Sequence, residues 1–427
     1  MPPDNTAVVT TTFEKSFLKD RSITFDHSGF KLSLYKNSKI YRIVLNNPVK
    51  SSKICLNRWN RIDLKLVTEM GLPVMATEQP IVTSCKLLQR ETIGYAESKD
   101  LLIDCRPVAA DSWEGMNDKA SNDQTGCFEY RIILNNKTCS NNTFFIYIHA
   151  DELSLHALPL CLGPFQLIQD LTPEKRLFWD DTTHDVNMHR VLPLDDQHHL
   201  VLKEMWDNGT PGKLWDSALM MSQIIIRLFK CNKEFLSGLR IMDLSAGVGS
   251  LGLLISELSH VYKIPNPPTV VLTDIPEALP LIKHNLSLND NHHHVQIKTL
   301  RWGLTRDIDR VLKRRPFDYI FVSDVLYNAN DFYSLIVTFR LLCDAAHPTK
   351  LYMGYKPRGL KAYEEDIFFT NCAVYFDIKQ LGLKEFEQDL LGNEQQADES
   401  IDRSLRFTGV QLYRLLPRKE KLIHKEK

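Results

Sequence analysis

The sequence predicts an α/β protein in which a doubly wound parallel sheet follows an N-terminal β-rich accessory region. The chain has 427 residues, which is too many for one ordinary domain and suitable for two. Up to about residue 200, short alternating apolar runs are separated by polar turns, whereas strand-like and helix-like runs alternate beyond about Met205. We therefore expect an accessory region at 1–200, an α/β domain at 201–417 and a basic tail at 418–427.

The accessory region has the pattern of short antiparallel strands. Apolar residues alternate over Phe30–Leu34 and return over Ile40–Leu45 after a polar turn, which predicts a hairpin. A second hairpin is predicted for Phe128–Leu134 and Phe144–His149, around the polar stretch NNKTCSNN. Asp111–Gly126 is rich in Asp, Asn, Ser and Gly and is expected to be a loop. Because this half carries no catalytic motif, we expect it to serve substrate recognition.

The α/β domain is expected to alternate strands and helices. Arg240–Leu244 is a short apolar strand, Leu251–Val261 is helical, and Thr269–Thr273 is a second strand. A helix at Pro276–Asn289 has proline in its first turn, where no backbone donor is needed. Phe317–Ser323 is almost continuously apolar, as expected for a parallel strand covered on both faces. The remaining predictions are strands at Val295–Leu300, Lys350–Tyr355, Ala373–Lys379 and Phe407–Leu415, and a helix at Asp331–Ala345.

The composition disfavours nucleic acids and membranes as partners. Lys and Arg number 52 against 53 Asp and Glu, so no whole-surface basic footprint favours a nucleic-acid partner. The N-terminus lacks the basic start and apolar core of a signal peptide. The longest apolar run, Ala218–Phe229, is interrupted by polar residues and is too short to span a bilayer, so no membrane association is expected.

The cysteine pattern indicates a reducing compartment and no metal centre. The nine cysteines are scattered singly, without a C-x-x-C pair, which disfavours a zinc knuckle and a thiol-redox motif. We expect the chain in the cytoplasm, with the nucleus as a second location, and as a monomer.

A glycine-rich loop provides the strongest local motif. Gly247, Gly249 and Gly252 form a G-x-G-x-x-G pattern directly after a predicted strand and at the start of a predicted helix. Glycines at these points allow a tight turn and a close approach to a ligand. Asp274 closes the next strand, where an acid can bind both hydroxyls of a ribose.

Two ligands fit such a loop, and nearby charge distinguishes between them. Asp243 stands just before the loop and Asp324 follows the apolar strand. Two carboxylates facing the crevice would repel the pyrophosphate of a nicotinamide dinucleotide and attract a cationic ligand. The sequence therefore favours S-adenosylmethionine, which carries a sulfonium and an ammonium group.

Five ordered motifs resemble one known family. They are GKLWDSA, DLSAGVGSLGL, TDIPEALPLIKHNLSLN, LRWG and DYIFVSDVLYN. Together they look like the seven-β-strand methyltransferases of family 16, which are similar to protein-lysine methyltransferases. The resemblance extends from about Leu202 to Leu416. It implies a Rossmann-like seven-stranded methyltransferase sheet and S-adenosylmethionine-dependent methylation of a lysine side chain in a protein substrate.

The resemblance also implies roles for individual residues. Asp274 would bind the ribose, Trp302 would flank the adenine, and Trp215 would contact the ligand from an N-terminal lid. Asp324 and Tyr327, in a D-x-x-Y pattern, would form the catalytic wall where the amine enters. The complete predicted cofactor set is Trp215, Asp243, Ser245, Ala246, Gly247, Gly249, Asp274, Trp302 and Ser323.

Two features leave alternatives open. Ser245 stands where the family usually has glycine, which is the one feature that supports a non-catalytic interaction protein with this fold. Enzymes that methylate planar amides or base amines usually have Pro-Pro where this chain has Val325–Leu326, so glutamine or adenine methylation is disfavoured. A methyltransferase acting on RNA or on a small molecule is a further alternative. The intact Asp274, Trp302 and D-x-x-Y set favours an enzyme.

Overall fold

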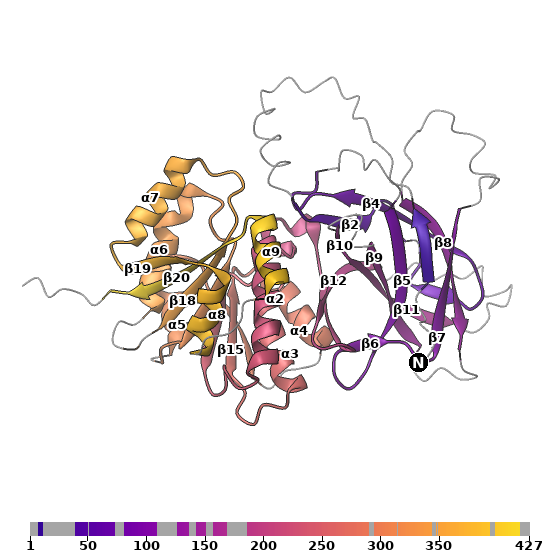
Figure 1. Ribbon diagram of the computed structural model, residues 1–427, viewed down its shortest axis with the longest axis horizontal. Helices are drawn as coiled ribbons and strands as arrows, with labels where there is room; N and C mark the ends of the chain where they lie inside the picture. The colour runs from indigo at the N-terminus through magenta and orange to yellow at the C-terminus, as the bar shows by residue number, and fades with distance from the viewer. Residues whose placement is uncertain are drawn as a thin grey trace, which may run out of the picture. The chain divides into compact units, whose positions relative to one another are not determined.

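The computed structural model divides into two compact units, Met1–Glu204 and Met205–Lys427, whose elements are drawn in Figure 1. It describes residues 7–11, 39–49, 51–72, 81–108, 126–135, 142–150, 157–168, 186–289, 294–313, 315–343, 347, 349–392 and 398–418. The predicted strand at Phe30–Leu34 and nearly all of the predicted loop at Asp111–Gly126 lie outside these residues.

The first unit is built from two β-sheets, which confirms the prediction of a β-rich N-terminal region. One sheet has five strands in the order β10-β2-β4-β8-β7, and the other has eight, along the path β1-β5-β6-β13-β12-β11-β3 with β9 paired to β5 and β11. Buried side chains from both sheets form one apolar core, as in a sandwich. The strands are β1 (Ala7–Thr11), β2 (Tyr41–Leu45), β3 (Lys53–Cys55), β4 (Asn60–Val67), β5 (Ile81–Arg90), β6 (Tyr95–Glu97), β7 (Leu101–Pro107), β8 (Gly126–Leu134), β9 (Thr143–Ala150), β10 (Ala157–Leu158), β11 (Leu160–Ile168), β12 (Asn187–Pro193) and β13 (His199–Lys203).

The predicted hairpin of Phe128–Leu134 with Phe144–His149 is wrong, although both segments are strands. β8 pairs with β4 and β7, whereas β9 pairs with β5 and β11 in the other sheet. β8 alternates buried and less buried residues along most of its length, and β9 does so from Ile146 onward. Alternation alone does not specify the partner strand, because either sheet of a sandwich satisfies it.

The second unit is a doubly wound α/β domain with a seven-stranded sheet in the order β16-β15-β14-β17-β18-β20-β19. The first five strands of this order are parallel, and β20 runs antiparallel to both of its neighbours. The sheet comprises β14 (Arg240–Leu244), β15 (Thr269–Asp274), β16 (Val295–Thr299), β17 (Tyr319–Ser323), β18 (Lys350–Tyr355), β19 (Phe376–Leu381) and β20 (Gln411–Pro417). Because the order reverses at β14, the ligand crevice of such a sheet is expected at the carboxyl ends of β14 and its neighbours.

Helices accompany the strands of the second unit. They are α2 (Asp216–Cys231), α3 (Ser250–Val261), α4 (Leu279–Asn289), α5 (Thr305–Leu312), α6 (Phe332–Leu342), α7 (Ala362–Cys372), α8 (Leu383–Leu391) and α9 (Glu399–Thr408). No helix among the described residues has the length and apolar character needed to cross a bilayer. Gly354 of β18 allows α2 to lie close to the sheet, because a Cβ there would stand 2.7 Å from the sulfur of Met221.

Several predicted boundaries differ from the structure: the strand predicted at Ala373–Lys379, for example, is Phe376–Leu381. Two further differences have clear local reasons. The helix predicted from Pro276 begins at Leu279, after a turn in which the amide of Ala278 donates to the carbonyl of Ile275. Phe407 belongs to α9 and not to the last strand. Gly409 ends that helix in a left-handed conformation, with φ of 74°, before β20 begins.

Candidate active site

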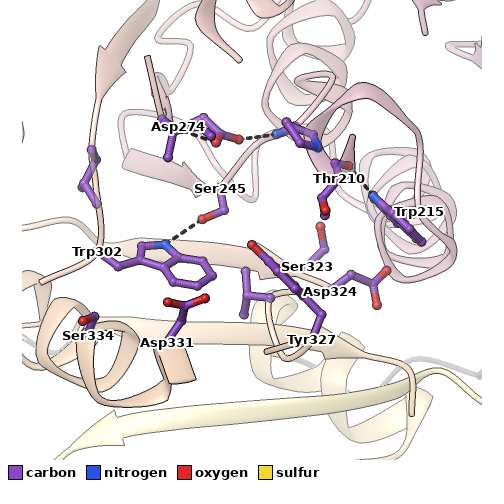
Figure 2. Close-up of a pocket in the computed structure, with 15 residues that line it drawn as sticks. Thr210, Trp215, Ser245, Asp274, Trp302, Ser323, Asp324, Tyr327, Asp331 and Ser334 are labelled. Carbon is purple, nitrogen blue, oxygen red and sulfur yellow. Dashed lines mark hydrogen bonds between the residues drawn. The ribbon is translucent and has the colours of Figure 1, made fainter. Parts of the chain in front are cut away.

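A cavity of about 300 Å³ lies at the carboxyl ends of the central parallel strands. Figure 2 shows that its wall comes from segments far apart in the sequence. Eight predicted site residues line it: Trp215, Ser245, Gly247, Asp274, Trp302, Ser323, Asp324 and Tyr327. Seven lining residues were not predicted: Thr210, Pro211, Ile275, Leu300, Val325, Asp331 and Ser334.

The Asp274 carboxylate ties the glycine loop to the end of β15. Its Oδ2 accepts a hydrogen bond from the amide of Gly247 at 2.8 Å, and its Oδ1 accepts from the amide of Ile275 at 2.7 Å. Burial raises the pKa of Asp274 above its usual range, against the lowering effect of these two donors. Each carboxylate oxygen has a second lone pair, so the group can still accept from the two hydroxyls of a ribose.

Glycine is required in this loop by backbone conformation and by space. Gly247 and Gly249 have φ of 57° and 82°, values that favour glycine. A Cβ on Gly249 would approach side-chain atoms of Leu272, Leu253 and Ile282 at 3.1 to 3.3 Å. The loop therefore packs tightly against the sheet and α3, which fixes its path beside the cavity.

Three predicted cofactor residues, Asp243, Ala246 and Gly249, are not among the residues that line the cavity. The Asp243 side chain is buried, and its Oδ2 accepts from the amide of Gly252 at 2.8 Å. Burial raises the pKa of Asp243 to about 7, helped by the nearby charge of Asp274. Asp243 thus holds the start of α3, and the prediction that it faces the crevice is corrected.

Ser245 connects the glycine loop to Trp302. The indole Nε1 of Trp302 donates to Ser245 Oγ at 3.0 Å, and the Trp302 ring centroid lies 6.3 Å from that of Tyr327. Ser245 has φ of 60°, the left-handed conformation that glycine adopts readily. Serine at this position therefore keeps the loop in a glycine-like path.

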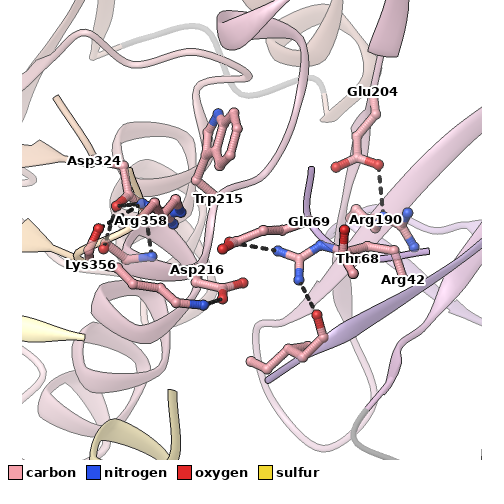
Figure 3. Close-up of polar contacts among 12 residues, drawn as sticks. Arg42, Thr68, Glu69, Arg190, Glu204, Trp215, Asp216, Asp324, Lys356 and Arg358 are labelled. Atoms are coloured by element: carbon pink, nitrogen blue, oxygen red, sulfur yellow. Dashed lines mark hydrogen bonds and ion pairs between the residues drawn. The ribbon is translucent and has the colours of Figure 1, made fainter. Parts of the chain in front are cut away.

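Both oxygens of the Asp324 carboxylate accept hydrogen bonds within the chain. Its Oδ2 accepts from the amide of Ser217 at 2.8 Å, and its Oδ1 accepts from Ser217 Oγ at 2.7 Å and from Arg358 Nη1 at 2.5 Å. Ser217 lies in the first turn of α2, so Asp324 stabilises the start of that helix and not of the helix that follows it in sequence. Figure 3 shows Asp324 beside Arg358.

The segment that leads into α2 is fixed by further polar contacts. Trp215 Nε1 donates to the carbonyl of Thr210 at 2.7 Å, and the Arg358 guanidinium carbon lies 5.1 Å from the Trp215 ring centroid. Lys356 Nζ is 2.5 Å from Asp216 Oδ2, and both side chains are buried. These contacts hold Trp215 at the wall of the cavity (Figure 2).

Asp331 is a carboxylate in the cavity wall that the sequence analysis missed. It immediately precedes α6 but makes no side-chain capping bond to that helix. Its Oδ2 accepts from the side-chain amide of Asn328 at 2.7 Å. Asp331 stands four residues after Tyr327, on the same loop as the D-x-x-Y pattern. This position was the sequence signal that could have placed it in the cavity wall.

Among the described residues, no cluster of three or more His, Cys, Asp or Glu side chains is arranged to hold a metal ion. The cavity instead offers carboxylates, hydroxyls and three aromatic side chains. Such a lining suits an organic ligand with a planar group, hydroxyls and positive charge.

Comparisons with known proteins identify similar chains. Residues 194–374 match the family described as lysine methyltransferase. EEF1A lysine methyltransferase 3 of Xenopus tropicalis is 31% identical over 165 residues, which are 37% of this chain and 65% of the relative. A UPF0665 family protein of Schizosaccharomyces pombe is 29% identical over 182 residues, 41% of this chain and 50% of that one. Protein-lysine N-methyltransferase EFM2 of Saccharomyces cerevisiae is 30% identical over 127 residues, 27% of this chain and 30% of that one.

Proposed function

We infer that this chain, whose residues 194–374 match the lysine methyltransferase family, is an S-adenosylmethionine-dependent protein-lysine N-methyltransferase. The chain spans two thirds or less of the length of the three relatives named above. The observation that carries the proposal is the convergence on one cavity of the glycine loop, Asp274, Trp302 and the D-x-x-Y segment.

The cavity lining fits the cofactor. Asp274 would accept from the ribose hydroxyls, the loop at Gly247 would pass beside the methionine part, and Trp302 would cover the adenine. Ser323, at the end of β17, would contribute a small side chain beside the ligand. When bound, S-adenosylmethionine supplies a methyl group activated by a positively charged sulfur, so the chain's own residues have only to position and deprotonate the amine.

The acceptor amine is positively charged in water and must lose a proton before it reacts. The Asp324 charge is paired with Arg358, which weakens its attraction for an incoming ammonium. The Asp331 carboxylate lines the cavity and, among the described contacts, accepts from the neutral amide of Asn328. We therefore propose Asp331 as the group that holds the entering ammonium, and Asp324 as a positioning residue for the wall that carries Tyr327.

Binding and product analysis test the proposal together. Calorimetric titration should show that S-adenosylmethionine binds and NADH does not. Asp274→Ala should weaken binding about 100-fold or more, because two hydrogen bonds to a charged group are lost. After incubation with tritiated S-adenosylmethionine and protein extract, acid hydrolysis should place the label in methyl-lysine. Label only in nucleic acid or in small molecules would contradict the proposal.

A further inference from the structure

Two non-glycine residues with a left-handed backbone conformation lie at the cavity. Five non-glycine residues have positive φ in the described part of the chain, and two of them, Ser245 and Asp324, line the cavity. A side chain in this conformation is disfavoured because its Cβ crowds the backbone. Strained residues persist where surrounding contacts hold them, and they occur often at functional sites. The contacts of Asp324 with α2 account for the backbone conformation of Asp324. Ser245 requires a separate contact that maintains its left-handed backbone.

The Ser245 side chain has a specific contact that glycine could not make. Its Oγ accepts from the indole Nε1 of Trp302 at 3.0 Å. This bond joins the loop after β14 to the loop after β16, so it bridges over the intervening strand β15. Figure 2 shows the hydroxyl directed at the indole nitrogen, on the cavity side of both loops.

The backbone on either side of Trp302 is already fixed. The amide of Leu300 donates to the carbonyl of Asp274 at 2.9 Å, and the amide of Gly303 donates to Thr338 Oγ1 at 2.8 Å. The remaining freedom of Trp302 is the orientation of its ring. The ring packs against the core of the second unit and lies beside Tyr327, and the hydrogen bond at Nε1 restricts its orientation further.

We propose that Ser245 is a positioning residue, whose hydroxyl fixes the Trp302 indole as a preformed flat wall for the adenine of the cofactor. The identity of the ligand in this inference rests on the proposed function. An indole ring that is already oriented loses less conformational freedom when the ligand binds. Its N–H group also keeps a hydrogen-bond acceptor when the ligand covers the ring. The strained backbone at Ser245 is maintained for this contact.

A double-mutant cycle on ligand binding tests the proposal. S-adenosylhomocysteine would be titrated by calorimetry into the full-length wild type, Ser245→Ala, Trp302→Phe and the double variant. Ser245→Ala should weaken binding about three- to tenfold, the effect of one hydrogen bond. In the Trp302→Phe background, which has no indole donor, the same change should have no further effect. An equal loss in both backgrounds would show that the hydroxyl acts on the ligand directly, and would overturn the proposal.

A ligand-free measurement separates this inference from the proposed function. In the ¹H–¹⁵N spectrum, Trp302→Phe identifies the Trp302 indole signal. Ser245→Ala should shift that signal and speed its hydrogen exchange, whereas the control Ser404→Ala, outside the cavity on α9, should not. An unchanged signal would overturn the proposal. A shifted signal in a protein that does not bind S-adenosylhomocysteine would instead count against the proposed function alone.

Ser245→Gly adds a test in which protein stability and ligand affinity should change differently. Glycine removes both the hydroxyl and the strain, whereas alanine removes only the hydroxyl. The melting temperature of Ser245→Gly should therefore exceed that of Ser245→Ala by about 2–4 °C, while both variants bind S-adenosylhomocysteine equally weakly. Wild-type affinity in Ser245→Gly would show that the hydroxyl is not needed.

Discussion

Asp243 illustrates how burial can turn a carboxylate into a pH-sensitive structural group. Its pKa of about 7 in the folded chain lies above the value of about 3.9 expected in the unfolded chain. The folded chain therefore binds more protons in this range, and the contribution of Asp243 to stability, complete below about pH 4, is lost as the pH rises through about 7.

Asp243→Asn should remove this pH dependence. Asparagine keeps an oxygen that can accept from the amide of Gly252 but does not titrate. Relative to the variant, the wild-type free energy of unfolding should fall as the pH is raised from 5 to 7 and level off above 7. Urea unfolding of both proteins at pH 5, 6, 7 and 8 measures this difference, and a difference that stays constant would contradict the pKa assignment.

Asp331→Asn should affect the acceptor and not the cofactor. The amide keeps the size of the side chain but removes the charge proposed to hold an incoming ammonium. We expect the KM for the protein substrate to rise at least about tenfold, since a hydrogen bond between charged groups contributes about 1.5–3 kcal/mol, with unchanged S-adenosylhomocysteine affinity. Asp366→Asn, an exposed position on α7 outside the cavity lining, is the matched control. Equal kinetics in the two variants would remove Asp331 from the site.

Site residues that belong to a recognisable sequence motif were predicted. Site residues outside a motif, which reach the cavity only when the chain folds, were missed. The glycine loop, Asp274 and the D-x-x-Y pattern stand next to predicted strand ends, and strand ends meet at one edge of a parallel sheet. The orientation of Asp243 was not predictable in the same way. A residue at the end of a strand can face the crevice or the helix behind it, and only the packing of α3 decides between them.

At the scale of elements, α2 depends on a carboxylate more than 100 residues away in sequence. Asp324 accepts from the amide and hydroxyl of Ser217 and pairs with Arg358. This arrangement couples the wall that carries Tyr327 to the helix that follows Trp215. A change at Asp324 should therefore affect the fold as well as the reaction.

Asp324→Asn should lower both stability and turnover, with a smaller effect on cofactor affinity. Asparagine retains one acceptor oxygen but removes the negative charge that faces the mostly buried Arg358 guanidinium, a loss of about 3 kcal/mol. Urea unfolding and methyl transfer measure the two effects. The double variant Asp324→Asn/Arg358→Met should recover part of the stability, because the guanidinium charge that faces position 324 is removed as well. Normal stability together with lost turnover would instead favour direct contact of Asp324 with the substrate.

Strands and helices were predicted correctly where the pattern of apolar residues within one short segment was sufficient to define them. The predicted bounds of the strands at Arg240–Leu244 and Lys350–Tyr355 agree with the structure, because continuous apolar runs between polar turns define buried parallel strands. Pairing was less predictable: β8 and β9 were expected to form a hairpin but belong to different sheets. Helices such as α5 and α9, with mainly exposed polar residues, were missed because they lack a strong apolar run.

At the scale of the whole molecule, the cavity is built entirely from residues of the second compact unit. A fragment comprising Met205–Lys427 should therefore bind S-adenosylhomocysteine within about threefold of the affinity of the full chain, a difference of about 0.7 kcal/mol. It should methylate its protein substrate poorly if the first unit recognises that substrate. Calorimetry and methyl transfer on the same fragment test this prediction. A folded fragment with full activity would exclude the recognition role of residues 1–200.

We propose that this cavity transfers a methyl group to a lysine side chain of a protein. The most direct measurement incubates the full chain with S-adenosylmethionine carrying a deuterated methyl group and with a lysate of cells that lack this protein, and then locates the heavy methyl by mass spectrometry. We predict heavy methyl on lysine of one protein or a few proteins, present with the wild type and absent with Asp274→Ala. Heavy methyl on other residue types alone, or equal labelling by Asp274→Ala, would show that this cavity does not methylate protein lysine.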